Sequence, residues 1–142
     1  MNNDISDYKI SDIEIGLKKQ FKITMSELIV DDFAKLSGDF NPLHTSNDYA
    51  LKTKFGKKIC HGMLLASYLS RLVGMYLPGK NSLYLSQKLN FPFPCYIDDE
   101  IIIEGKVISK SESANIITIE TIINKMSGEC VLKGTAKVMV RK

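Results

Sequence analysis

Two hydrophobic periodicities divide this chain. Residues 63–77 are apolar nearly all the way round a helix, a pattern typical of a helix enclosed by its fold. Pro78 and Gly79 follow, a pair that ends helices. Four later segments are rich in Ile and Val, alternate in part between apolar and polar positions, and are separated by turn residues. They predict strands over 82–90, 100–110, 115–125 and 129–140.

The N-terminal third carries weaker patterns. Residues 14–23 alternate in part and predict a first strand. Thr24 and Glu27 have the spacing of a capping box, so we expect a helix from there through Leu36 that ends near Gly38. One enclosed helix followed by an antiparallel meander indicates an α+β architecture, in which a sheet wraps around a helix.

The segment between the two predicted helices is rich in loop signals. Asn41-Pro42 predicts a turn, because the residue before a proline is disfavoured in the helical region. Ser46 can cap a short helix through Thr53. The first ten residues are expected to be loosely held, within a single domain that spans 1–142.

The composition excludes several classes of function. With 142 residues, of which 44% are hydrophobic and 25% charged, the chain can bury a core without a disulfide or a metal. A net charge of +3 is too small to indicate nucleic acid as a partner. The polar N-terminus lacks the order of a signal peptide, and 63–77 is too short to span a bilayer and contains Arg71. Cys60, Cys95 and Cys130 are odd in number and far apart, which predicts free thiols in a cytoplasmic protein with no membrane partner.

Both histidines lie in one stretch, SGDFNPLHTSNDYALKTKFGKKICHG, from Ser37 to Gly62. Asp39 and His44 are separated by the predicted turn, which can fold the chain so that both side chains face the same space. A carboxylate beside an imidazole can give and take a proton near neutral pH. The alternative is structural: Asp39 caps a turn, and His44 hydrogen-bonds to the backbone.

Gly62 precedes the long predicted helix, where unpaired backbone amides and the helix dipole can stabilise an oxyanion. Alternatively, Gly62 only eases the loop into the helix. His61 can contact a substrate or, in the interpretation that we favour, orient this loop. A metal site built from the two histidines, Asp39 and Cys60 is disfavoured. No usual zinc spacing is present, and Cys60 and His61, as neighbours, have difficulty ligating one ion, so we expect no metal and no cofactor.

The motifs SGDFNPLH and FGKKICHGML, at this separation, resemble the hydratase signature of the MaoC-like family, which includes the (R)-specific enoyl-CoA hydratases. The dense match covers Phe33 to Gly79, and a looser match continues to the C-terminus. The resemblance implies a hot-dog fold, in which an antiparallel sheet wraps one long helix and two domains pair into a homodimer. It implies hydration of a 2-enoyl thioester of CoA or a carrier protein to an (R)-3-hydroxyacyl thioester, or the reverse dehydration.

The same resemblance implies roles for individual residues. Asp39 and His44 would activate water and move the proton, and the backbone N–H of Gly62 would polarise the thioester carbonyl. Ser70 and Val73 match positions that line the family's acyl pocket. The predicted substrate-binding residues are Asn41, His61, Ser70 and Val73.

The chain departs from the family pattern in places. Ser46 stands where the family commonly has Asp, which could alter how the loop around His44 is held. Lys54, Lys57 and Lys58 could meet the phosphates of CoA or the acidic surface of a carrier protein; a solvated basic loop is the alternative.

Two other functions stay open. Many hot-dog thioesterases place an acidic catalytic residue on the central helix, whereas residues 62–77 contain neither Asp nor Glu. A non-catalytic module that binds acyl thioesters would have no need of a proton-transfer pair.

Overall fold

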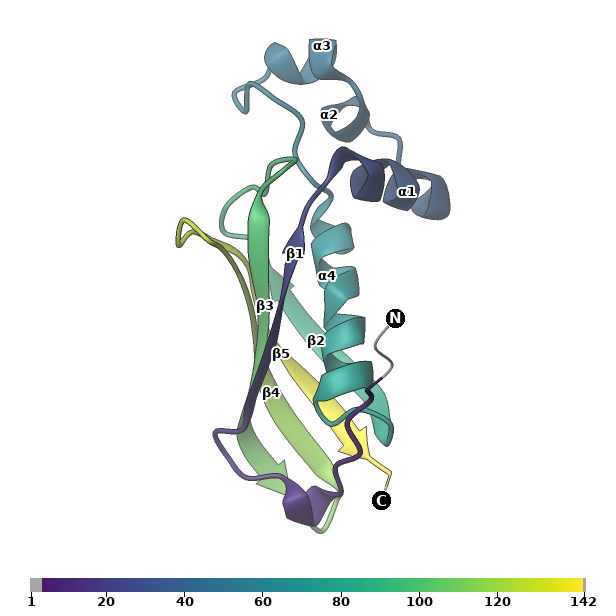
Figure 1. Ribbon diagram of the computed structural model, residues 1–142, viewed down its shortest axis with the longest axis vertical. Helices are drawn as coiled ribbons and strands as arrows, with labels where there is room; N and C mark the ends of the chain where they lie inside the picture. The colour runs from purple at the N-terminus through teal and green to yellow at the C-terminus, as the bar shows by residue number, and fades with distance from the viewer. Residues whose placement is uncertain (1–3, 142) are drawn as a thin grey trace.

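Five antiparallel strands form one sheet, and helix α4 lies along its face in the computed structural model, which describes residues 4–141 (Figure 1). The strands are β1 (Lys18–Thr24), β2 (Ser82–Asn90), β3 (Glu100–Ser111), β4 (Ile116–Lys125) and β5 (Cys130–Val140), and a 3₁₀ turn, η1 (Ile10–Asp12), precedes them. Their order is β1-β3-β4-β5-β2, so the predicted meander β3-β4-β5 forms the centre and β1 and β2 the edges. This is the hot-dog arrangement, an α+β fold, that the resemblance implies.

The long helix consists of two parts. α4 (Gly62–Arg71) continues into η2 (Leu72–Tyr76), a π-helical turn, where the sequence predicts one uninterrupted helix to Leu77. Gly105 on β3 faces this turn, and a Cβ there would lie 2.8 Å from Cδ2 of Leu72. A glycine in the strand therefore lets η2 approach the sheet closely.

Buried side chains between the helix and the sheet form two clusters. Buried and partly buried positions alternate along the whole of β4, as a strand period of two requires. The α4 cluster contains Met25, Val30, Cys60, Leu64, Leu65, Leu69, Leu72, Cys95, Ile101, Ile103, Ile123, Val131 and Leu132. The η2 cluster contains Ile13, Val73, Leu77, Val107, Ile117, Ile119, Ala136, Val138 and Val140.

Three helices lie beyond one end of the sheet (Figure 1). They are α1 (Glu27–Ser37), α2 (Pro42–Thr45) and α3 (Asn47–Leu51), and we call residues 27–61 the overhang. Helix α1 ends at Gly38, which has the left-handed conformation (φ +80°) that the sequence predicts for a helix end. α3 is the predicted short helix, whereas α2 was predicted only as a turn.

The start of α1 differs from the prediction. Thr24 is the last residue of β1, and Ser26 is the N-cap, since its Oγ accepts the N–H of Ile29 at 3.3 Å. The predicted capping box between Thr24 and Glu27 is therefore wrong. The chain is still paired in the sheet at Thr24 and enters the helix only after Ser26.

The N-terminal segment packs against the turn that follows η2. The N–H of Ser6 donates to the carbonyl of Met75 at 2.9 Å, and Asp7 forms an antiparallel bridge with Gly79. The first ten residues were expected to be loosely held, and these contacts differ from that expectation for the residues described. Residues 1–3 lie outside the described residues. Gly16, with φ +99°, turns the chain and delays the start of β1 relative to the predicted strand.

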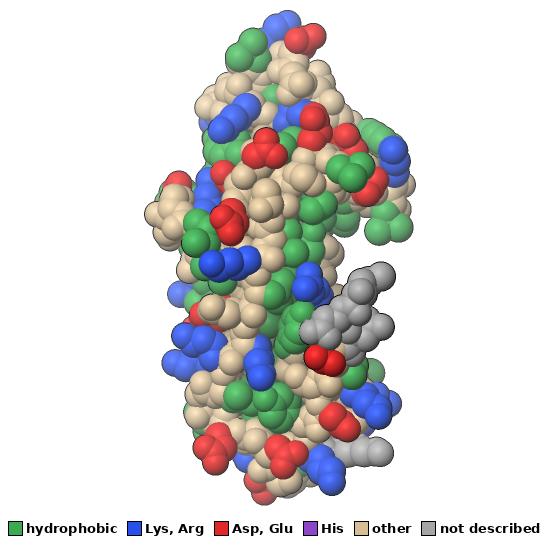
Figure 2. Space-filling view, viewed as in Figure 1, with side chains coloured by type: hydrophobic (Ala, Val, Ile, Leu, Met, Phe, Trp, Pro, Cys, Tyr) green, Lys and Arg blue, Asp and Glu red, His purple; other side chains and the backbone are tan. Residues whose placement is uncertain are grey.

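One side of α4 is uncovered in the single chain. Met63 is 59% exposed and Ser67 and Ser70 are also exposed, whereas Leu64 and Leu65 are buried. The prediction of a helix enclosed on all sides is wrong for this side. A column of hydrophobic side chains is also visible on the face of the molecule shown in Figure 2. Within residues 4–141, no helix has the length and apolar character needed to cross a membrane.

Candidate active site

A turn and a short helix in the overhang carry Asp39 and His44. The Oδ1 of Asp39 accepts the N–H of Asn41 at 3.1 Å, and the Oδ1 of Asn41 accepts the N–H of Leu43 at 3.0 Å. Asn41 is thus the N-cap of α2, and Pro42 occupies the first helical position, where its missing N–H is tolerated. The predicted turn is present, and Asn41, a predicted substrate-binding residue, stabilises it.

A backbone contact fixes the ring of His44. Its Nδ1–H donates to the carbonyl of Ile59 at 2.7 Å, which ties α2 to the segment that leads into α4. In the neutral ring this bond leaves Nε2 unprotonated and therefore able to act as a base. His44 is half-buried and Asp39 is exposed, so a ligand can reach both side chains.

His61 joins the parts of this site. Its Nε2–H donates to the backbone carbonyl of Asp39 at 3.0 Å, and its ring stacks on that of His44 with centroids 3.9 Å apart. The ring of Phe33 packs edge-on against it at 4.9 Å. His61 is 2% exposed and directly precedes Gly62, so it holds Asp39 and His44 beside the start of α4. This geometry supports the loop-orienting interpretation over direct contact with a substrate.

Burial lowers the pKa of His61 below its ordinary value, although the hydrogen bond to Asp39 acts in the opposite direction. The neutral ring fits its surroundings, since Nε2 carries the proton donated to Asp39. Among the described residues, the buried Nδ1 of His61 has no hydrogen-bond partner. His61 therefore lies as a neutral ring against His44.

Gly62 is the first residue of α4, and Phe91 packs directly over it. At this position the N–H has no acceptor inside the helix. A Cβ on Gly62 would lie 3.1 Å from the ring of Phe91, so the close approach of the ring favours glycine here. Phe91 was not among the predicted site residues, because the sequence FPFP at 91–94 indicates only a turn between two strands. The two phenylalanines in that turn were the available sign of a packing role.

A cavity of about 370 Å³ lies beside Gly62. Its walls come from the end of the overhang, the start of α4 and the β2–β3 loop, and include Phe55, Cys60, Gly62, Leu65, Phe91 and Cys95. The lining is mainly apolar.

A second hollow, of about 400 Å³, lies between α1, α4 and β2. Ser70 lines it together with Phe33, Met63 and Leu89, so this predicted acyl-pocket residue faces open space. Val73, the other predicted acyl-pocket residue, is 1% exposed and packs in the η2 cluster.

The residues that depart from the family pattern have defined partners. The Oγ of Ser46 accepts the N–H of Tyr49 at 3.2 Å and caps α3, a task that Asp also performs well. Lys58 is buried and pairs with Glu27, unlike a lysine of a solvated loop. The ammonium of Lys57 lies 4.6 Å from the ring centre of Tyr96.

Among the described residues, one group could hold a cation: Asp39, His44 and His61. Their ligand atoms all lie within 4.8 Å of one another. Each histidine donates one ring N–H to a carbonyl, as metal ligands often do. The remaining nitrogen of His61 is buried, however, and within this described cluster only Asp39 and His44 are accessible. The arrangement fits proton transfer better than ligation.

The fold and the site together define a class of protein. A sheet with one long helix, an overhang that carries an Asp–His pair, and a glycine at the start of the helix are the features that the resemblance to MaoC-like hydratases implies. The family model for the MaoC like domain matches residues 11–127, and the chain belongs to this family.

Similar proteins cover nearly the whole chain. The (R)-specific enoyl-CoA hydratase of Aeromonas caviae is 41% identical over 126 residues, which are 89% of this chain and 94% of that protein. The 3-hydroxybutyryl-CoA dehydratase of Methylorubrum extorquens is 37% identical over 134 residues, 92% of this chain and 83% of that protein. Among solved structures, the unliganded R-hydratase of Pseudomonas aeruginosa has a TM-score of 0.90 at 31% identity, covering 94% of this chain and 86% of that one.

Proposed function

We propose that this protein is a hydro-lyase that adds water to a 2-enoyl thioester to give an (R)-3-hydroxyacyl thioester, and that it catalyses the reverse dehydration. The observation that carries this proposal is the contact of His61 with both Asp39 and His44, directly before the start of α4. The hydratase and dehydratase named above, both similar to this chain along most of its length, support the same reaction.

The chemistry follows from the charges that develop during the reaction. Asp39 and His44 together remove a proton from water, whose oxygen bonds to the β carbon of the enoyl thioester. Electrons from the double bond move onto the thioester oxygen as an enolate, which the N–H of Gly62 and the helix N-terminus stabilise. The proton taken from water is then delivered to the α carbon, so that the net change is the addition of one water.

The other predicted residues support this reaction in different ways. Asn41 and His61 hold the catalytic loop, as their hydrogen bonds to Asp39 indicate. Ser70 contacts the acyl chain in the hollow beside α4, whereas Val73 packs in the buried η2 cluster. The substrate carrier is CoA or an acyl carrier protein.

The decisive experiment offers the purified protein a panel of enoyl and 3-hydroxyacyl thioesters, on CoA and on carrier protein. We expect the absorbance of the enoyl thioester to fall, with chiral analysis giving the (R)-3-hydroxy product. Release of free CoA while the enoyl absorbance is unchanged would instead identify a thioesterase. Binding of the thioesters without turnover would identify a binding module.

We further propose that two copies of the chain form the active homodimer. β2 is an edge of the sheet, and Leu83 and Leu85 on it are exposed, as is Met63 on α4. Pairing of two β2 strands would extend the sheet and cover these apolar side chains. Light scattering on the eluting protein should give twice the chain mass of 15.9 kDa, and a monomer that turns over substrate would refute this proposal.

A further inference from the structure

Cys60 and Cys95 lie opposite each other on two short extended segments. Ile59 and Tyr96 form an antiparallel bridge, so the next residue of one segment faces the preceding residue of the other. The N–H of Cys60 donates to the carbonyl of Cys95 at 2.7 Å, which confirms this register. Directly opposed residues of an antiparallel pair have Cα atoms about 4.5–5.5 Å apart. This spacing falls within the range of about 4.4–6.8 Å that a disulfide spans.

The two thiols are free, closely paired and open to one cavity. They are 4% and 1% exposed, and both line the cavity beside Gly62, which gives a small molecule access to them. The thiol of Cys95 points to the carbonyl of Tyr96, with 3.8 Å between sulfur and oxygen. A hydrogen bond with Cys95, together with burial, raises the pKa of the Cys60 thiol.

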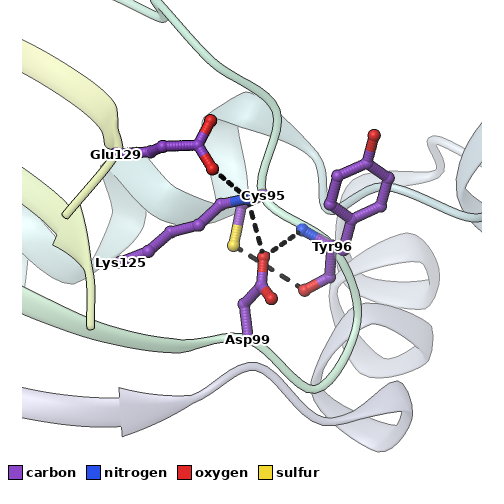
Figure 3. Close-up of polar contacts among 5 residues, drawn as sticks. All are labelled: Cys95, Tyr96, Asp99, Lys125 and Glu129. Atoms are coloured by element: carbon purple, nitrogen blue, oxygen red, sulfur yellow. Dashed lines mark hydrogen bonds and ion pairs between the residues drawn. The ribbon is translucent and has the colours of Figure 1, made fainter. Parts of the chain in front are cut away.

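A set of polar contacts holds the segment that carries Cys95 (Figure 3). The Oδ2 of Asp99 accepts the N–H of Tyr96 at 2.8 Å and lies 3.2 Å from the ammonium of Lys125. Lys125, the last residue of β4, also lies 3.9 Å from the carboxylate of Glu129, in the turn before β5. Because this segment is anchored to the sheet, a bond between the sulfurs would move the Cys60 segment rather than the Cys95 segment.

We propose that Cys60 and Cys95 form a reversible disulfide that lowers the catalytic activity by displacing the adjacent residues His61 and Gly62. A peroxide is the oxidant. One sulfur loses its proton and attacks a peroxide oxygen, giving a sulfenic acid and water; the other sulfur displaces the second water as the S–S bond forms. Both electrons thus pass to the peroxide, and two S–H bonds and one O–O bond are broken.

The expected loss of activity rests on the proposed function and on the short separation between Cys60 and Gly62 along the chain. The sulfurs must approach to about 2.05 Å, closer than any contact between two thiols. Cys60 is separated from Gly62 only by His61, so the N–H of Gly62 moves with it. Because a shift of about 1 Å at a catalytic group can reduce turnover about 10²-fold, we expect the oxidised protein to be at least about 10-fold slower.

The test treats the full-length protein with hydrogen peroxide and measures intact mass, digested peptides and turnover before and after reduction with dithiothreitol. We expect the mass to fall by that of two hydrogens, a peptide linking Cys60 to Cys95, and a loss of activity that reduction restores. Cys130→Ser is the matched control and should behave as the wild type, because the third thiol lies outside the pair.

Cys60→Ser and Cys95→Ala should each abolish the mass loss and keep their activity in peroxide. Two variants are used so that the test still holds if one of them fails to fold. The disulfide would be overturned if the mass loss persisted in either variant. It would also be overturned if oxidation of the wild type stopped at separate sulfinic acids. A Cys60–Cys95 bond that leaves turnover unchanged would overturn its coupling to Gly62. Since the mass measurement needs no substrate, failure of the proposed function would appear separately, as an untreated protein inactive on every thioester.

Discussion

The α4 cluster and the η2 cluster lie under the same sheet but differ in composition. Every fully buried member of the η2 cluster is Ile, Val, Leu or Ala, such as Ile119 and Val138. The α4 cluster adds Met25, Cys60 and Cys95 to its aliphatic residues. Branched side chains fit the regular surface of paired strands, whereas flexible or small ones fill the irregular space where the chain leaves the sheet for the overhang.

The difference in composition corresponds to a difference in task. The η2 cluster contacts the N-terminal segment and the turn after η2, and its side chains supply packing alone. The α4 cluster includes Cys60, one residue from His61, so its packing also determines where Asp39 and His44 lie relative to Gly62. Substitutions at the two ends should therefore affect different quantities: turnover near the overhang, and the free energy of unfolding near η2.

Asp39→Asn should have the largest effect. Turnover should fall about 10²–10⁴-fold, because the amide cannot accept a proton from water, while the melting temperature stays close to that of the wild type. Turnover is measured by the enoyl absorbance and stability by thermal unfolding. Asp48→Asn is the matched control, since Asp48 is an exposed acid in the same overhang, and it should retain full activity. Full activity of Asp39→Asn would exclude Asp39 as the base.

Ile119→Ala tests the η2 cluster, at the end of the sheet away from the overhang. It should lower the free energy of unfolding by about 2–5 kcal/mol, because Ile119 is fully buried in the η2 cluster, and leave turnover per folded molecule unchanged. Urea unfolding gives the first quantity and kinetics at low temperature the second. Ile108→Ala, at a side chain 43% exposed on β3, should cost less than about 1 kcal/mol. A loss of turnover in Ile119→Ala would show that the two ends are coupled.

Gly62→Ala should reduce turnover about 10–10²-fold, with a smaller loss of stability. The added methyl meets the ring of Phe91 and shifts either the ring or the first turn of α4. Gly74→Ala is the control, because a Cβ there has open space, and it should leave turnover unchanged. If Phe91→Ala restores activity to Gly62→Ala, the clash with the ring is the cause. If it does not, the methyl itself obstructs the substrate.

The smallest effect concerns the pH dependence of stability. The pKa of His61 is lower in the folded chain, so below about pH 6.5 the unfolded chain binds a proton that the folded chain does not. The free energy of unfolding should therefore decrease as the pH falls through this value. His61→Asn should show a shallower decrease in urea unfolding between pH 7.5 and 5.5. An equal slope in both proteins would contradict a buried neutral His61.

The sequence predicted elements better than it predicted their junctions. The four late strands agree with the observed ones to within one residue at each end, because the period of two is strong in paired strands. The start of α1 and the helix α2 were missed, since capping depends on where the chain leaves its sheet partner. Ser26, rather than Thr24, is the first residue free to cap α1.

The sequence by itself determined the strand pattern, the long helix and the motif that places Asp39, His44 and Gly62 within one segment. It did so because local periodicity and turn chemistry act between near neighbours. Only the tertiary structure brought Phe91 onto Gly62 and set Cys60 against Cys95. Those contacts join residues far apart in the chain, and their formation depends on how the overhang and the β2–β3 loop pack at one end of the sheet, which no local pattern encodes.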